Sequence, residues 1–172
     1  MALCLCACVP PWLVGLGYSE AVFYRPYTSD DFPALYAIEE LCFQSSLRYS
    51  RSYMRQLLKN PNAAAWIAED AGIMCGFAIV EWTRESQGVV AYVQTIEVLP
   101  EFRGCGGGRE LLRLIDGSAL AAGAGLIWLH VDVKNSAAIR LYEALGYVED
   151  GRREDYYAPG RAAFIYAKEL KL

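Results

Sequence analysis

The spacing of apolar residues in the first third of the chain predicts one strand and two helices. Residues 21–24 form a short run of strand-forming side chains before Pro26. Residues 28–31, Thr-Ser-Asp-Asp, are typical helix N-cap residues, and apolar residues follow at helical spacing over 32–42. A second helix is expected to begin after Ser50 and to stop near Pro61.

The rest of the chain reads mainly as strands, with two further helices. Two strand-like runs, 64–69 and 73–83, flank Asp-Ala-Gly at 70–72 and predict a hairpin. The later elements are expected to be strands at 89–98, 126–133, 147–157 and 162–169, with helices at 107–122 and 136–146. The order βααβββαβαββ, without repeats or low-complexity linkers, predicts a single α/β domain in which helices pack on a mixed sheet.

Composition narrows the class of protein. The chain has 172 residues, of which 55% are hydrophobic and 21% charged, and this suits a well-buried core. The net charge of -4 argues against an extended nucleic-acid surface, which needs clustered Lys and Arg. An acidic protein is compatible with a cationic substrate such as an amine. No nucleic-acid partner is therefore expected.

The six cysteines do not predict a disulfide framework or a metal site. Cys4, Cys6 and Cys8 lie close together, the other three stand apart, and no Cys-x-x-Cys pair occurs. His130 is the single histidine, so nitrogen ligands are scarce. We expect no metal and a reducing, cytoplasmic location.

Residues 1–17 are apolar and carry no charged side chain. A secretory signal would begin with a basic stretch, and the run is interrupted by Pro10 and Pro11 and is too short to span a bilayer. We interpret 1–17 as an N-terminal extension, packed on the domain or poorly ordered, and 18–172 as the functional domain. An overlong translation start and a membrane anchor are the alternatives; no membrane association is expected.

A glycine-rich turn joins the strand that ends at Val98 to the next helix. Its residues are Arg103, Gly104, Cys105, Gly106, Gly107, Gly108 and Arg109. A turn of this kind presents backbone N–H groups at a positive helix terminus, which suits a pyrophosphate, and the two arginines add charge-assisted contacts. The turn lacks the Gly-Lys-Ser/Thr of a P-loop and has the wrong glycine spacing for a dinucleotide-binding turn. A plain glycine-rich turn is the remaining alternative.

Two motifs together resemble the GNAT acetyltransferase superfamily. Residues 103–108 resemble its Arg/Gln-x-x-Gly-x-Gly/Ala signature, and residues 135–147 resemble its second motif, Asn-x-x-Ala-x-x-Leu-Tyr-x-x-x-Gly-Phe/Tyr. Glu39, Cys42 and Phe43 are similar to the first helix of RimI-like members. The resemblance implies a GNAT-type fold, with a central, mostly antiparallel sheet in which two strands splay apart.

The resemblance also implies where acetyl-CoA binds. The backbone of Ile96, Glu97 and Val98 would pair with the pantetheine arm, and residues 103–109 would hold the pyrophosphate. Asn135 would contact the arm. Tyr142 would lie at the thioester sulfur and protonate the leaving thiolate, although its place on an apolar helix face also suits a core aromatic. No covalent enzyme intermediate is expected, so Cys105 is interpreted as a spacer.

Three residues are candidates for the base that deprotonates the amine. RimI-like enzymes often carry Glu five residues before the Asn of the second motif, and this chain has His130 there. Imidazole, with a pKa near 6.5, is a suitable base, so an activity limb is expected near pH 6 to 7. Tyr92 occupies a strand position at which other members carry Glu or Tyr, and it can share a water with His130. Glu97 is a further carboxylate nearby.

Tyr156 and Tyr157 resemble the Tyr-Tyr pair of RimI-like enzymes and are expected to wall the acceptor site, or to be ordinary strand aromatics. An α-amine has a pKa near 8 and a lysine about 10.4, so a modest base favours a peptide or protein N-terminus as the acceptor. The protein is expected to be a monomer or a homodimer. Small amines such as polyamines or amino acids remain open. So does a regulatory module that binds acyl-CoA without turnover.

Overall fold

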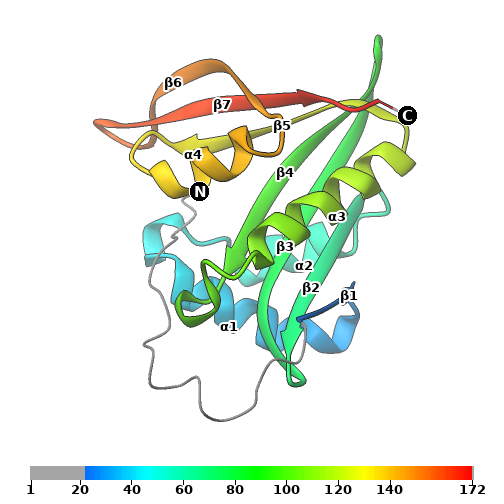
Figure 1. Ribbon diagram of the computed structural model, residues 1–172, viewed down its shortest axis with the longest axis vertical. Coiled ribbons are helices and arrows are strands. Elements are labelled where there is room, and N and C mark those ends of the chain that lie inside the picture. The colour runs from blue at the N-terminus through cyan, green and yellow to red at the C-terminus, as the bar shows by residue number, and fades with distance from the viewer. Residues whose placement is uncertain (1–21, 172) are drawn as a thin grey trace.

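The computed structural model describes residues 22–171, which form one seven-stranded sheet with helices on both faces (Figure 1). The strands are β1 (Phe23–Pro26), β2 (Ala63–Asp70), β3 (Ile73–Glu85), β4 (Gly88–Val98), β5 (Ala124–Asp132), β6 (Val148–Ala158) and β7 (Arg161–Glu169). The helices are α1 (Phe32–Cys42), α2 (Arg51–Leu58), α3 (Gly107–Ala121) and α4 (Ser136–Glu143), with 3-10 turns at Ser29–Asp31, Ser45–Leu47 and Pro100–Phe102. The predicted order of helices and strands is confirmed. The predicted extension 1–17 lies outside the described residues.

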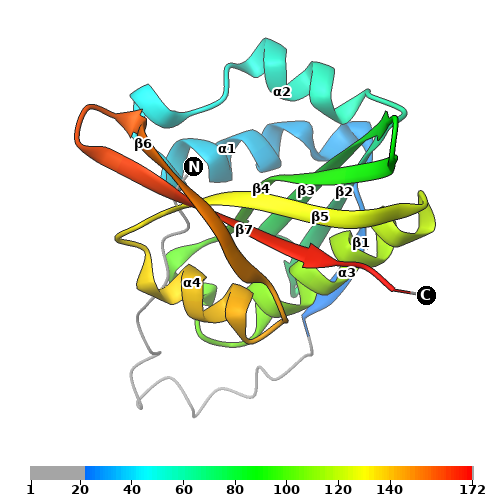
Figure 2. The same cartoon turned by 90° about the horizontal axis from the view of Figure 1, so that it is seen from above.

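The strand order is β1-β2-β3-β4-β5-β7-β6. Within residues 22–171 the β4–β5 pair is parallel and the other pairs are antiparallel, so the expected mostly antiparallel sheet is confirmed. Figure 2 shows α1 and α2 on one face of the sheet and α3 and α4 on the other. Each face has its own apolar core, one centred on Leu35 and Phe77 and the other on Leu112 and Ile127.

The two central strands separate halfway along their length. β4 pairs with β5 only from Val89 to Tyr92, and the register ends at the Tyr92–Trp128 pair. The pairing of β4 with β3 shifts immediately afterwards, leaving Gln94 as an extra residue between Val93 and Thr95. A bulge of this kind bends a strand and increases its local twist, which turns β4 away from β5. The predicted splayed strand pair is therefore confirmed.

Two local features help to fix how these elements begin and pack. The Ser50 hydroxyl accepts from the Tyr53 N–H at 3.2 Å and caps α2, as expected. Gly76 on β3 must be glycine because a Cβ there would lie 2.6 Å from the Glu97 carbonyl oxygen, too close for the paired β4 backbone.

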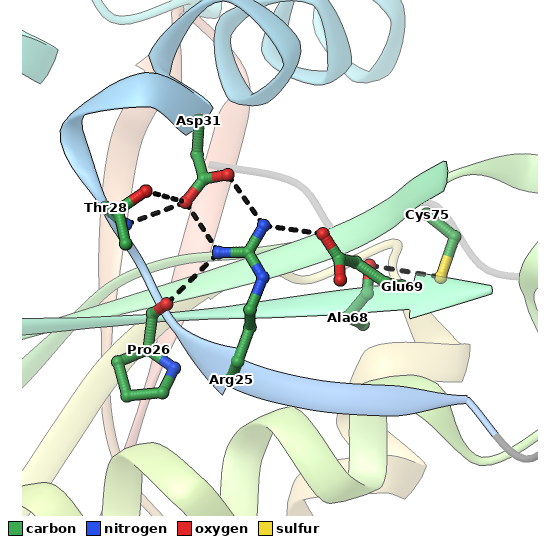
Figure 3. Close-up of polar contacts among 7 residues, drawn as sticks. All are labelled: Arg25, Pro26, Thr28, Asp31, Ala68, Glu69 and Cys75. Atoms are coloured by element: carbon green, nitrogen blue, oxygen red, sulfur yellow. Dashed lines mark hydrogen bonds and ion pairs between the residues drawn. The ribbon is translucent and has the colours of Figure 1, made fainter. Parts of the chain in front are cut away.

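A charged cluster ties β1 to the start of α1 and to β2 (Figure 3). The Arg25 guanidinium donates to both oxygens of Asp31 at 2.7 Å and to Glu69 at 2.5 Å, while Asp31 also accepts from the Thr28 backbone N–H. These hydrogen bonds, led by those from Arg25, lower the pKa of Asp31 to about 2. The edge strand is thus joined to the domain by side chains as well as by its ladder.

Candidate active site

The glycine-rich loop has the backbone shape that an anion site requires. Gly104 and Gly106 adopt positive φ angles of 80° and 89°, and Gly106 is the N-cap of α3, a helix of 15 residues. The N–H groups of Gly107 and Gly108 belong to the first helical turn, which has no intrahelical acceptors for them. Cys105 and Arg109 are exposed beside the loop. The residues expected to hold a pyrophosphate therefore lie together.

Arg103 is oriented differently from the expectation. Its side chain is buried, the Nε donates to the Val98 carbonyl oxygen at 2.7 Å, and an Nη contacts the Cys42 sulfur at 3.7 Å. The guanidinium thus points into the protein, because it is held by a carbonyl oxygen at the end of β4. The expected charge-assisted contact from the Arg103 side chain is therefore corrected, while Arg109 remains exposed.

The second half of β4 has an unpaired edge facing β5. Ile96, Glu97 and Val98 lie beyond the last β4–β5 pair and bond to β3 on their other side. The Val98 carbonyl oxygen already accepts from Arg103, and the other outward-facing backbone groups line the gap, where an extended amide-bearing chain can add to the sheet as a strand would. This is the arrangement expected for the pantetheine arm.

Asn135 supplies a polar group on the opposite side of the gap. Its Oδ1 accepts from the Ala138 N–H at 3.2 Å and caps α4, while its Nδ2 is buried without a partner among the described residues. An orphaned buried donor carries a free-energy cost that a carbonyl oxygen of a ligand would remove. The residues present therefore fit the amide-bearing arm of acetyl-CoA.

Tyr142 lies on α4 with its side chain 2% exposed. Its ring packs against Tyr147 and Tyr166, at centroid distances of 5.7 and 6.3 Å. Burial raises the pKa of Tyr142, so its phenol keeps its proton at neutral pH. It also lines a cavity of about 20 Å³ together with Tyr92 and His130, and is thus both a core aromatic and a member of the site.

Tyr92 and His130 face one another across β4 and β5. The Tyr92 hydroxyl lies 3.2 Å from His130 Nδ1 and 3.4 Å from the Tyr156 hydroxyl. His130 Nε2 is buried without a partner among the described residues. The cavity beside them has room for about one water molecule, consistent with the expected shared water.

Burial, with the charge of Arg153, lowers the pKa of His130 to about 4. The expected activity limb near pH 6 to 7 is therefore corrected, because desolvation disfavours the imidazolium. His130 is neutral at physiological pH and can accept a proton only transiently.

Tyr156 and Tyr157 on β6 add two aromatic rings beside Tyr92 and His130. Tyr156 stacks on the His130 ring at 4.0 Å, and Tyr157 meets Tyr156 edge-on at 4.9 Å. Both are partly buried. Their place beside the central gap suits an acceptor-binding role.

Two residues beside the candidate site were missed from sequence. Gln94 lines the cavity, its amide Nε2 donates to Glu81 at 2.8 Å, and its Oε1 accepts from the Tyr49 hydroxyl at 2.9 Å. A glutamine within the apolar run Tyr-Val-Gln-Thr-Ile was the available signal for Gln94. The segment that places Tyr49 has no repeating pattern, so nothing pointed to it.

Residues 22–171 contain no cluster of three or more His, Cys, Asp or Glu side chains that could hold a metal ion. None of the helices among these residues is long and apolar enough to span a membrane.

Comparison with known proteins shows which family the chain is similar to. Residues 32–147 match the Acetyltransferase (GNAT) family. An uncharacterized protein of Mycobacterium leprae is 30% identical over 97% of this chain, which spans only 51% of that relative. An N-alpha-acetyltransferase of Sulfurisphaera tokodaii is 31% identical, over 71% of this chain and 78% of its own length.

A solved structure resembles the whole described domain. The ribosomal-protein-S18-alanine N-acetyltransferase from Escherichia coli aligns with a TM-score of 0.77 at 26% identity, covering 88% of this chain and 96% of its own. The expected fold and the resemblance stated from the two motifs are confirmed.

Proposed function

Because the chain belongs to the GNAT acetyltransferase family, we propose that it transfers the acetyl group of acetyl-CoA to the α-amine of a peptide or protein N-terminus. The relatives support this acceptor: one is named for α-amine acetylation and another for acetylation of an alanine of a ribosomal protein. The single observation that carries the proposal is the meeting of Tyr142, Tyr92 and His130 at one small cavity in the gap between β4 and β5.

The binding of acetyl-CoA would use three parts of this gap. The loop 103–108 and Arg109 would hold the pyrophosphate, the free edge of β4 at 96–98 would pair with the arm, and Asn135 Nδ2 would donate to an arm carbonyl. Bound acetyl-CoA supplies an activated acetyl thioester. The phenol of Tyr142 keeps its proton and would donate it to the departing sulfur.

Tyr92 and His130 would handle the amine proton. Together they can hold one water, through which the proton leaves the amine as it attacks. Since the pKa of His130 is only about 4, this pair assists proton departure but cannot deprotonate a strongly basic amine in advance. The amine must therefore enter neutral.

The cavity wall selects for a neutral amine. Its nine lining residues include no Asp or Glu, so an ammonium ion would lose its hydration without gaining a counter-charge. An α-amine with pKa near 8 is neutral about 250 times more often than a lysine with pKa about 10.4, a difference of about 3 kcal/mol. This favours N-termini over lysine side chains.

The test is CoA release from acetyl-CoA with a matched panel of acceptors. One peptide with an internal lysine is offered with a free and with a blocked N-terminus, beside polyamines and amino acids. Turnover only with free N-termini is expected. Turnover with the blocked peptide would refute the α-amine as the acceptor, and turnover only with small amines would refute a peptide or protein acceptor. CoA binding without any turnover would favour the regulatory module.

A further inference from the structure

Two carboxyl groups from different elements lie wholly inside the protein. Glu39 on α1 is 0% exposed and Glu97 on β4 is 2% exposed. Glu39 Oε1 accepts from the Tyr49 N–H at 2.8 Å, and Glu97 Oε1 accepts from the Thr95 hydroxyl at 2.9 Å. The Oε2 of each is buried without a donor among the described residues. An unsatisfied buried carboxylate oxygen is costly, so two of them call for a common explanation.

A proton between the two carboxyls would account for both orphaned oxygens. Glu39 acts on Glu97 side chain to side chain, and carboxylates that share a site hold a proton more tightly than isolated ones. Burial, followed by the hydrogen bond and charge of Glu39, raises the pKa of Glu97, while Thr95 and Arg103 oppose the shift. One shared proton satisfies both Oε2 atoms at once.

The charges of the surrounding elements balance for one proton. The groups that face the pair are Tyr49 from the segment after α1, Thr95 from β4 and the Arg103 cation from the loop. Two carboxyls with one proton carry a charge of -1, and the buried Arg103 cation offsets it through its field, while its own bonds among the described residues go to Val98 and Cys42. Burying this combination avoids the cost of an uncompensated interior charge.

The cluster also connects the two halves of the site. On the acceptor side, Glu39 holds the Tyr49 backbone, and the Tyr49 hydroxyl reaches Gln94 in the cavity wall. On the cofactor side, Glu97 belongs to the free edge of β4, and Arg103 begins the glycine-rich loop.

We propose that Glu39 and Glu97 share one proton and, with Arg103 as counter-ion, act as positioning residues that hold the acceptor wall and the glycine-rich loop in one arrangement. Calling the two sides the acceptor side and the cofactor side rests on the proposed function. The shared proton does not rest on it, so the proton and the positioning role are tested separately.

The proton is tested by 13C NMR of glutamate side-chain carboxyls. One carboxyl is expected to remain protonated at pH 7.5 in the parent protein and to disappear in Glu97→Gln, whose amide can donate to Glu39 and keep the hydrogen bond. Two ionised carboxyls at pH 7.5 in the parent protein would overturn the proposal. This result is independent of any enzymatic activity.

The stability of the parent protein has a defined pH dependence. A carboxyl whose pKa is raised on folding stabilises the fold below its unfolded pKa, about 4.3, and loses that contribution as pH rises through the folded value. The melting temperature is therefore expected to fall between pH 5 and 9 more in the parent protein than in Glu97→Gln. Parallel curves would contradict a shared proton.

The positioning role is tested by substrate constants. Glu39→Gln is expected to keep the Kd for CoA and the acceptor KM within about twofold, because its amide can still accept from the Tyr49 N–H and can donate to Glu97. Glu39→Leu should raise both constants by about fivefold or more with a smaller change in kcat. If Glu39→Leu does not fold, the isosteric pair Glu39→Gln/Glu97→Gln, which leaves Arg103 uncompensated, replaces it with the same expectation. A change in only one constant, or in neither, would overturn the coupling. Without turnover on any acceptor the proposed function fails, and the NMR and CoA-binding results still decide the cluster.

Discussion

Replacing Tyr142 by Phe tests the proposed acid with the least disturbance of the fold. The substitution deletes one oxygen and keeps the ring, which packs on Tyr147 and Tyr166 in a fully buried position. The hydroxyl is protonated at assay pH because burial raises the pKa of Tyr142. Its loss removes the proton donor and little else.

The expected cost falls on the chemical step. A positioned general acid contributes roughly 10²–10⁴-fold, or about 3–5 kcal/mol of activation free energy. The glycine-rich loop, the β4 edge and Asn135 are untouched by the change. The Kd for CoA should therefore stay within about threefold while kcat falls by at least about a hundredfold.

The assay measures CoA release together with calorimetric CoA binding. Tyr147→Phe is the matched control, because the Tyr147 hydroxyl is also buried but donates to Asp116 at 2.5 Å, away from the cavity. Lys168 still reaches Asp116 at 2.7 Å, so the control should lose about 1–2 kcal/mol of stability with kcat retained. A kcat for Tyr142→Phe within threefold of the parent, or an equal loss in both variants, would refute the reasoning.

Three further predictions follow from the site. Asn135→Ser keeps a neutral side-chain oxygen that can cap α4 but removes the orphaned Nδ2 donor, so calorimetry should show weaker CoA binding with little change in the melting temperature; equal affinity would exclude the proposed contact. Gly106→Ala, at φ 89°, should lower the free energy of unfolding by about 1–2 kcal/mol and weaken CoA binding. Gly117→Ala, on the exposed face of the same helix, should raise it by about 0.4–1 kcal/mol and leave CoA binding unchanged; thermal melts and calorimetry check both variants. His130→Gln should lower kcat/KM and should flatten the loss of stability between pH 6.5 and 4, because a histidine with its pKa lowered to about 4 stabilises the fold above 6.5 and loses that contribution on acidification; an unchanged slope would contradict the burial of a neutral imidazole.

The elements were predictable because their signals are local. Ser50 and Asn135 cap helices through bonds to residues three positions away, and the 70–72 turn joins strands that pair directly. Hydrophobic spacing and cap residues carry this information within a few positions of the chain.

The parts that escaped prediction depend on distant contacts. The direction of Arg103 is decided by the Val98 carbonyl and by Cys42, 61 positions away. The lowered pKa of His130 follows from how deeply the fold buries it, and the Glu39–Glu97 pair exists only once α1 packs on β4. No periodicity in one segment encodes such three-dimensional neighbours.

The early end of the β4–β5 ladder divides the hydrogen bonding of the sheet into two parts. β1 to β4 form one part and β5 to β7 the other, and the sheet hydrogen bonds between them are confined to Val89–Tyr92 on β4. The apolar core beneath α3 joins the two parts, so they separate only where the backbone bonds stop. A cofactor seated in the gap would bond to both parts and would shield the backbone of residues 93–98. Amide hydrogen exchange at these residues would then report whether the gap is filled.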